Sequence, residues 1–98
     1  MWEFDARLES WREFERAYGP TGTWARLFRK GDGYVATELL RDRETSGRYV
    51  TIDRWDSRAA FEAFRERFAA EYERLDQACE ALTTRETLIG RFEDAAGM

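Results

Sequence analysis

Two kinds of hydrophobic pattern divide the chain. Alternating apolar and polar residues, typical of strands with one buried face, occur over residues 2–6, 33–42, 48–55 and 83–93. Apolar residues at spacings of three and four, which form one face of a helix, occur over residues 8–18, 23–30 and 57–82. Turn-forming residues separate these segments. The pattern predicts the order β-α-β-β-α-β, with the short helix at 23–30 inserted before the second strand.

The longest apolar stripe lies in the last helical segment. Its members are Phe61, Phe64, Phe68, Tyr72, Leu75, Cys79 and Leu82. They recur without a gap, and arginines and glutamates occupy the positions between them. The spacing therefore predicts one continuous amphipathic helix.

The predicted element order indicates a specific fold class. Right-handed crossovers convert β-α-β-β-α-β into a four-stranded antiparallel sheet with both helices on one face. This is the ferredoxin-like arrangement of the α+β class. A chain of 98 residues fits one such domain, spanning residues 1–98.

The two alternating sets of the third strand are both mixed in polarity. One set is Val50, Ile52 and Arg54, and the other is Tyr49, Thr51, Asp53 and Trp55. The second strand is mixed in the same way, although a sheet with one wet face should alternate more strictly. We therefore expect a second copy of the chain to cover the helix-free face, in a two-fold homodimer.

The composition limits the kinds of partner that this domain is expected to bind. The net charge is −4 and no basic patch is present, so we expect no nucleic-acid binding. No apolar run approaches the roughly 20 residues of a membrane span, so we expect no membrane partner. A single cysteine, Cys79, cannot form an internal disulfide, which favours a cytoplasmic location. Aromatic residues make up 15% of the chain, enough to suggest a partner surface or a ring-lined cavity besides the core.

The residue types that the chain lacks exclude most of the common catalytic and metal-binding sites. The chain has no histidine, which excludes a Ser-His-Asp triad and a histidine-ligated metal or haem. One cysteine cannot build a zinc or iron–sulfur site. The "GDG" at 31–33 is a turn and lacks the Lys-Ser/Thr of a phosphate-binding loop. We expect no cofactor and no metal, with carboxylate-only metal binding as the one alternative left.

The junction of the third strand and the long helix carries a family resemblance. Within "YVTIDRWDSRAAFEAFRERF", at 49–68, the motif W-x-S-x-x-x-F is formed by Trp55, Ser57 and Phe61. Together with "GY" at 33–34 and "ETLIGRFE" at 86–93, this resembles the antibiotic biosynthesis monooxygenase family. The resemblance implies a dimeric α+β barrel that dimerises through its sheets.

The resemblance implies two chemistries. Some members oxygenate polyketide-like phenols and anthrones without a cofactor, because the substrate carbanion itself reduces O₂. Haem-degrading members use a strand-one Asn, a Trp at the strand-three junction and a helix His. Here only Trp55 matches, the chain has no asparagine, and Arg65 lies about where the histidine would be. The chain therefore lacks two of the three residues that the haem-degrading reaction uses.

Each candidate site residue has a structural alternative. The proposed substrate-binding residues are Trp24, Trp55, Phe68 and Tyr72. Trp55 is either a plug at the corner of the core or a pocket wall between helices and sheet. The others are either core filler or part of the same pocket.

The candidate catalytic groups are Glu38, as a base, and Arg54, as a cation for an anionic intermediate. Their alternative is an ion pair at a dimer interface or at an exposed rim. Two functions follow. One is a cofactor-independent monooxygenase for a small aromatic or polyketide-type substrate, and the other is a non-catalytic dimeric ligand-binding or assembly module.

Overall fold

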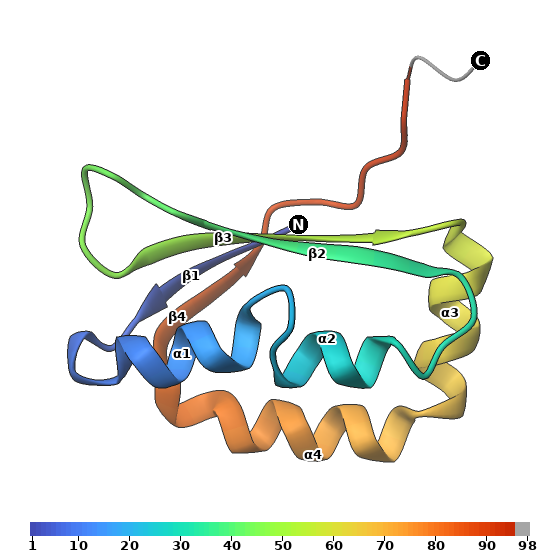
Figure 1. The fold of residues 1–98 in the computed structure, drawn as a ribbon, viewed down its shortest axis with the longest axis horizontal. Helices are drawn as coiled ribbons and strands as arrows, with labels where there is room; N and C mark the ends of the chain where they lie inside the picture. Colours follow the sequence, from blue (N-terminus) through green and yellow to red (C-terminus); the bar gives the residue numbers. More distant parts are fainter. Residues whose placement is uncertain (96–98) are drawn as a thin grey trace.

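The computed structural model of the protein describes residues 1–95 (Figure 1). Its strands are β1 Trp2–Ala6, β2 Tyr34–Arg41, β3 Arg48–Trp55 and β4 Thr83–Leu88. Its α-helices are α1 Trp11–Tyr18, α2 Thr23–Phe28, α3 Arg58–Arg67 and α4 Ala69–Cys79, with short 3₁₀ turns η1 Leu8–Ser10 and η2 Glu80–Leu82. The helices all lie on one side of the sheet (Figure 1). The predicted ferredoxin-like fold is confirmed.

The four strands pair in the order β2-β3-β1-β4, and every pair is antiparallel. The β2–β3 hairpin turns at Gly47, whose φ of +83° is the left-handed conformation that glycine adopts without strain. Its carbonyl accepts a 2.7 Å hydrogen bond from the backbone N–H of Ala6, which ties the hairpin to β1. The first and third strands are therefore central, as the split βαβ order requires.

An aromatic core fills the space between sheet and helices. Phe14 of α1 is completely buried. Its ring stacks on Tyr18 at 4.5 Å and lies 4.7 Å from the ring of Tyr49 on β3. Phe4 of β1 completes this group at 5.4 Å from Phe14. Cys79 is buried at the end of α4, as expected for a small hydrophobic residue.

The predicted continuous helix over 57–82 is wrong in one respect, because it is broken at Phe68. The φ and ψ of Phe68 are −108° and 27°, and α4 turns away from α3 there (Figure 1). A straight helix from Arg58 to Cys79 would be about 33 Å long at 1.5 Å per residue. The turn keeps both apolar faces on the core, with Phe64 of α3 against β3 and Tyr72 of α4 against α2.

Two predicted boundaries also change. The first helical segment begins as the 3₁₀ turn Leu8–Ser10 before α1 starts at Trp11. The last strand ends at Leu88, whereas alternation predicted a strand to residue 93. Leu88 pairs with Trp2 at the beginning of β1, so residues beyond it have almost no partner strand. Ile89 and Phe92, which follow, are exposed.

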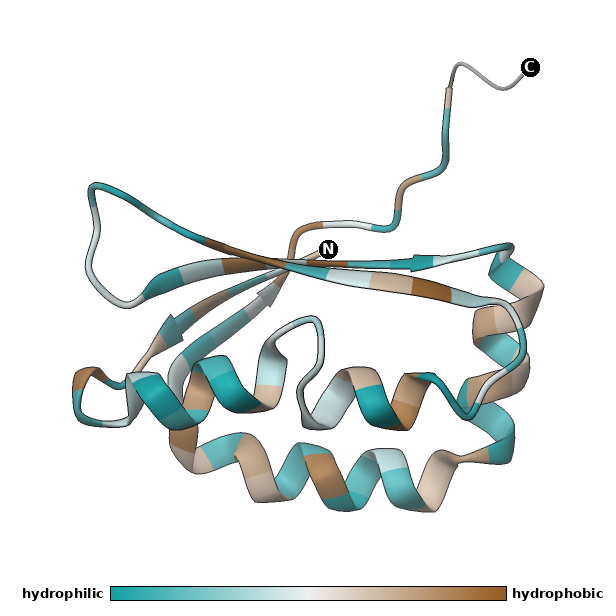
Figure 2. Ribbon diagram, viewed as in Figure 1, coloured by the Kyte–Doolittle hydropathy of each residue, from teal (hydrophilic) through white to brown (hydrophobic). Residues whose placement is uncertain are grey.

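The helix-free face of the sheet carries exposed apolar side chains. Val35 is 56% exposed and Leu40 is 49% exposed, and Val50 and Ile52 beside them are half-buried. Apolar segments recur along β2 and β3 among polar ones (Figure 2). A hollow of about 310 Å³ lies over this region, lined by Met1, Leu40, Arg41, Asp42, Arg48, Tyr49, Val50 and Ile52.

Candidate functional site

Trp55 occupies the corner where β3 passes into α3. Ser57 caps the helix, since its Oγ accepts a 3.1 Å hydrogen bond from the backbone N–H of Ala60. The ring of Trp55 lies 5.1 Å from Phe64 and 5.5 Å from Phe61. It also contacts Phe28 and Tyr34, yet it is only half-buried. Trp55 therefore packs at the corner of the core and also leaves part of its ring accessible.

Phe64, which is 2% exposed, lies between Trp55 and two other predicted pocket residues. Phe68 lies 5.5 Å and Tyr72 lies 6.4 Å from the Phe64 ring. Trp24 of α2 meets Tyr72 edge to face at 4.9 Å. We call these five side chains, Trp24, Trp55, Phe64, Phe68 and Tyr72, the aromatic cluster.

Two hydrogen-bond donors of the aromatic cluster lack protein acceptors. The indole Nε1 atoms of Trp24 and Trp55 are buried, and neither reaches an acceptor among residues 1–95. The Trp24 ring lies 6.0 Å from the Tyr18 ring. Burial raises the pKa of Tyr18 and of Cys79, and the Trp24 indole opposes this effect on both groups. A buried indole N–H normally finds a partner, so the Trp55 donor is suited to a ligand oxygen.

A cation covers the Tyr72 ring. The Arg65 guanidinium lies 3.7 Å from the ring centroid, a cation–π contact between α3 and α4. Burial raises the pKa of the Tyr72 hydroxyl, and the nearby positive charge of Arg65 opposes this effect. Tyr72 is therefore held neutral, as a hydrogen-bonding group at the edge of the cluster.

Sequence reasoning missed a carboxylate on the same side of the sheet. Asp53 lies two residues before Trp55, so both point toward the helices. Thr37 of β2 donates a 2.7 Å hydrogen bond to Asp53 Oδ1, and the Tyr34 hydroxyl lies 2.7 Å from Thr37 Oγ1. Burial raises the pKa of Asp53, while the Thr37 hydrogen bond and the Met1 ammonium group lower it. The signal was available, because alternation assigns Asp53 and Trp55 to one face.

Glu38 and Arg54 lie on the opposite side of the sheet. The Arg54 Nε atom is 3.3 Å from a Glu38 carboxylate oxygen, and both side chains are about half exposed, at 48% for Glu38 and 54% for Arg54. Arg54 is adjacent to Trp55 in a strand, so its side chain must point away from the helices. Within one protomer, the structure does not bring these two candidate catalytic residues to the aromatic cluster. They form an exposed ion pair on the helix-free face.

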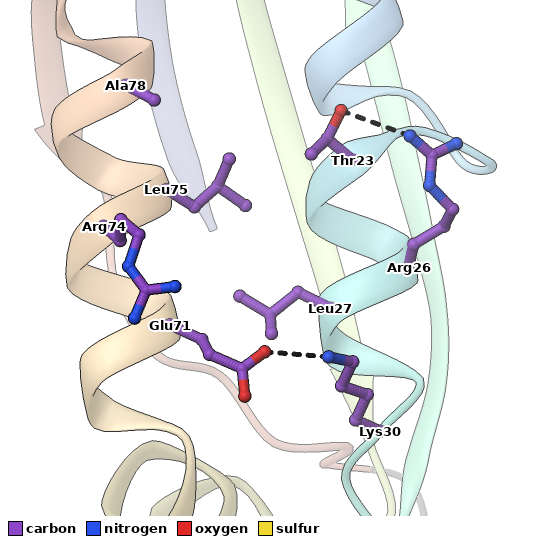
Figure 3. Close-up of a pocket in the computed structure, with 8 residues that line it drawn as sticks. All are labelled: Thr23, Arg26, Leu27, Lys30, Glu71, Arg74, Leu75 and Ala78. Carbon is purple, nitrogen blue, oxygen red and sulfur yellow. Dashed lines mark hydrogen bonds and ion pairs between the residues drawn. The ribbon is translucent and has the colours of Figure 1, made fainter.

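The larger hollow lies outside the aromatic cluster, between α2 and α4. It measures about 420 Å³ and is lined by Thr23, Arg26, Leu27, Lys30, Glu71, Arg74, Leu75 and Ala78. Figure 3 shows Leu27 and Leu75 facing each other across it, with Lys30 and Glu71 meeting at 2.8 Å. Both members of that ion pair are substantially exposed, so it contributes little to stability.

The family is shown by the match of residues 21–81, more than half of the chain, to the family model described as antibiotic biosynthesis monooxygenase. The chain belongs to this family. The matched segment includes α2, the β2–β3 hairpin, α3 and α4, and therefore the whole aromatic cluster. A search of the curated proteins finds no match.

Solved structures similar to this family member share its fold. SnoaB from Streptomyces nogalater, described as a cofactor-independent oxygenase, is 22% identical with a TM-score of 0.64, over 97% of this chain and 92% of that one. A mutant of SnoaB matches with a TM-score of 0.66. PA3566 from Pseudomonas aeruginosa is 21% identical with a TM-score of 0.60, over 88% of this chain and 82% of that one.

Neither a metal-binding cluster nor a membrane-spanning helix is present among residues 1–95 of this antibiotic biosynthesis monooxygenase family member. Among residues 1–95, no three His, Cys, Asp or Glu side chains are grouped so that they could hold a metal ion. In the same part of the chain, no helix is both long and apolar enough to span a bilayer.

Proposed function

We propose that the protein is a cofactor-independent monooxygenase that oxidises a small, electron-rich aromatic or polyketide-type substrate at the aromatic cluster. The observation that carries the proposal is the buried indole N–H of Trp55, which has no acceptor among residues 1–95. Family membership supplies the class of reaction. The SnoaB likeness supports it, because that protein is described as a cofactor-independent oxygenase.

The aromatic cluster suits a flat ring. Trp55, Phe68 and Tyr72 are half-buried, so a ligand can reach their rings from solvent. A ring stacked there gains apolar burial, and its oxygen can accept the Trp55 hydrogen bond once the side chains that cover this buried N–H move aside. Arg65, held over Tyr72, adds positive charge that would stabilise a phenolate or enolate.

The reaction then depends on the substrate. Loss of a proton leaves an electron-rich anion, which reduces O₂ directly. The protein has to exclude water, hold the ring and accept the proton. These tasks need only apolar walls, hydrogen-bond donors and a base.

Oxygen consumption tests this proposal. We expect purified protein to increase O₂ uptake by one or more members of a panel of anthrones, naphthols and related phenols, with chelator present and no cofactor added. Each substrate without protein is the control for autoxidation. If no member of the panel is oxidised faster with protein than without it, the enzymatic proposal fails.

A second function is favoured by the packing of the aromatic cluster. Phe64 is almost fully buried and contacts Trp55, Phe68 and Tyr72, so it fills the space between them. A domain with this packing could bind a small ligand without turnover, or act only in assembly. A panel member that quenches tryptophan fluorescence on binding, without O₂ uptake, would favour this alternative.

The proposed active form is a homodimer joined through the helix-free face. Exposed Val35 and Leu40 and half-buried Val50 and Ile52 form an apolar strip on this face. The Glu38–Arg54 pair lies within this strip, between Val35 and Leu40, and Arg48, which bridges Glu3 and Asp42, lies beyond Val50. Apolar residues between paired charges suit a self-complementary two-fold interface.

We expect sedimentation at micromolar concentration to give twice the chain mass of 11.6 kDa. Leu40→Arg should convert the dimer to a folded monomer, because it places a charge in the apolar strip. Leu8→Arg, at a 63% exposed position in η1, is the matched control and should leave the dimer intact. A wild-type protein that sediments as a stable, compact monomer would contradict the interface.

A further inference from the structure

We infer that Asp53 is the base that takes the proton from the substrate bound against Trp55. This inference rests on the proposed function, and it assigns the proton-accepting group at that site. Four features support it: the position of Asp53, its hydrogen bonds, its lack of an arginine partner and its environment.

The position of Asp53 follows from strand alternation. Asp53 and Trp55 are both on β3 and both face the helices. Asp53 is half-buried, directly opposite Thr37 of β2 in the strand register. A ring held by the Trp55 indole would lie on the same face of β3 as this carboxylate, two residues along the strand.

Two hydrogen bonds in series lead toward the Asp53 carboxylate. Thr37 has one hydroxyl proton, and it goes to Asp53 Oδ1 at 2.7 Å. The Tyr34 hydroxyl must then donate to Thr37 Oγ1, also at 2.7 Å. This line of donors fixes the carboxylate and engages one oxygen only. No donor among residues 1–95 reaches Asp53 Oδ2.

Asp53 differs from the carboxylates on and beside the sheet that pair with arginines, and it resembles Asp5 and Glu86, which form no arginine salt bridge among residues 1–95. Glu3, Glu38 and Asp42 each lie within 4.0 Å of an arginine, and so does Glu15 of α1. An arginine partner holds a carboxylate in its ionised form and makes it a weak base. Among the described residues, Asp53 has no such salt bridge.

The charges around Asp53 come from several elements. The Met1 ammonium group, at the beginning of β1, acts on its carboxylate. From α4, the Tyr72 hydroxyl is close enough for its pKa to respond to the charge of Asp53, and Arg65 of α3 covers Tyr72. Burial exceeds the opposing effects and raises the pKa of Asp53, which strengthens it as a base at neutral pH.

The proposed step is balanced for a phenol or an anthrone. The substrate O–H or C–H bond breaks, its proton goes to Oδ2 of Asp53, and the electron pair stays on the substrate. O₂ then adds to a ring carbon, which forms a C–O bond, and Asp53 returns its proton to the outer oxygen. The O–O bond breaks with loss of the remaining hydrogen on that carbon, giving a carbonyl and water.

The test combines turnover with a readout that needs no turnover. Asp53→Asn should lower kcat about 100-fold or more, because a general base contributes about 10²–10⁴ to the rate. Thr37→Val removes a hydrogen bond that lowers the Asp53 pKa. A base acts only when ionised, so the acid limb of the wild-type pH–rate profile should move to higher pH in Thr37→Val.

The second readout uses 4-nitrophenol, whose neutral and ionised forms absorb at different wavelengths. The negative charge of Asp53 should raise the apparent pKa of the bound probe, and Asp53→Asn should lower it by about one unit. Glu86→Gln is the matched control, since burial also raises the pKa of Glu86, which lies on β4 near Asp76 and Glu80. Glu86 also acts on the Tyr72 hydroxyl, less than Asp53 does, so Glu86→Gln should shift both readouts far less than Asp53→Asn.

The two proposals fail in different ways. If the wild type oxidises a phenol and Asp53→Asn does so equally well, Asp53 is not the base and the oxygenase proposal stands. If Glu38→Gln abolishes turnover while Asp53→Asn does not, the base lies on the helix-free face. If no phenol is oxidised, the oxygenase proposal fails, and the 4-nitrophenol shift alone decides whether Asp53 faces the ligand.

Discussion

Phe64→Ala should lower the free energy of unfolding by about 3–5 kcal/mol, the cost typical of removing a buried phenylalanine. Phe64 is 2% exposed, and its ring contacts Trp55, Phe28 and Phe68 at 5.1–5.5 Å. These contacts hold α2, α3 and β3 together at one end of the core. The neighbouring rings cannot fill the space left by the Phe64 side chain unless a helix or a strand moves. Chemical denaturation at a fixed protein concentration measures the change.

Phe61→Ala is the matched comparison, on the same helix and three residues earlier. Phe61 is only half-buried and contacts Trp55 at 5.5 Å. We expect about 1–2 kcal/mol, because part of its ring is already in water. Equal losses at the two positions would mean that Phe64 is not the centre of the aromatic cluster.

Trp55→Ala should weaken binding of a phenolic ligand about 10- to 100-fold while the protein stays folded. Removal of an aromatic wall forfeits about 1.5–3 kcal/mol of apolar burial, which corresponds to this range of affinity. The fold should survive because Trp55 is half-buried, whereas Phe64 behind it is not. Fluorescence of the remaining tryptophans or calorimetry measures binding, and circular dichroism monitors the fold.

Trp55→Phe separates the two contributions of this residue. It retains a smaller aromatic ring at the corner and removes the indole N–H, which has no acceptor among the described residues, together with part of the ring volume. We expect a loss of affinity of a few-fold to about tenfold, as for one hydrogen bond. If Trp55→Ala unfolds the protein and the wild type binds no phenol, Trp55 is a corner plug and the enzymatic proposal must be abandoned.

Local periodicity determined the elements and their order. A repeat of two or of three to four residues is a property of neighbouring side chains, so it is visible before any packing is known. The same logic identified Trp55, at the end of a strand and before the Ser57 cap, as a residue at a junction. It also grouped Phe61, Phe64, Phe68 and Tyr72 as one apolar stripe.

Glu38 and Arg54 show that the polarity of neighbouring residues does not decide which face of a sheet a side chain takes. Both residues lie among apolar neighbours in the sequence. Alternation from Trp55 assigns Arg54 to the opposite face and Asp53 to the same face. The parity of each residue relative to Trp55 was therefore better evidence than the polarity of its neighbours.

The sequence by itself determined the fold class, the family motif at Trp55, Ser57 and Phe61, and the stripe that supplies three of the five rings of the aromatic cluster, because all depend on local spacing. Tertiary structure alone decided the break at Phe68, which appears only when both halves of the stripe must reach one core. Tertiary structure also decided on which face of the sheet Tyr34 lies. An irregularity between Tyr34 and Ala36 in the pairing of β2 with β3 puts Tyr34 on the same face as Thr37, although simple alternation assigns them to opposite faces. The hydrogen bonds from Tyr34 to Thr37 and from Thr37 to Asp53 exist only because of that shift, since the partner strand fixes the register.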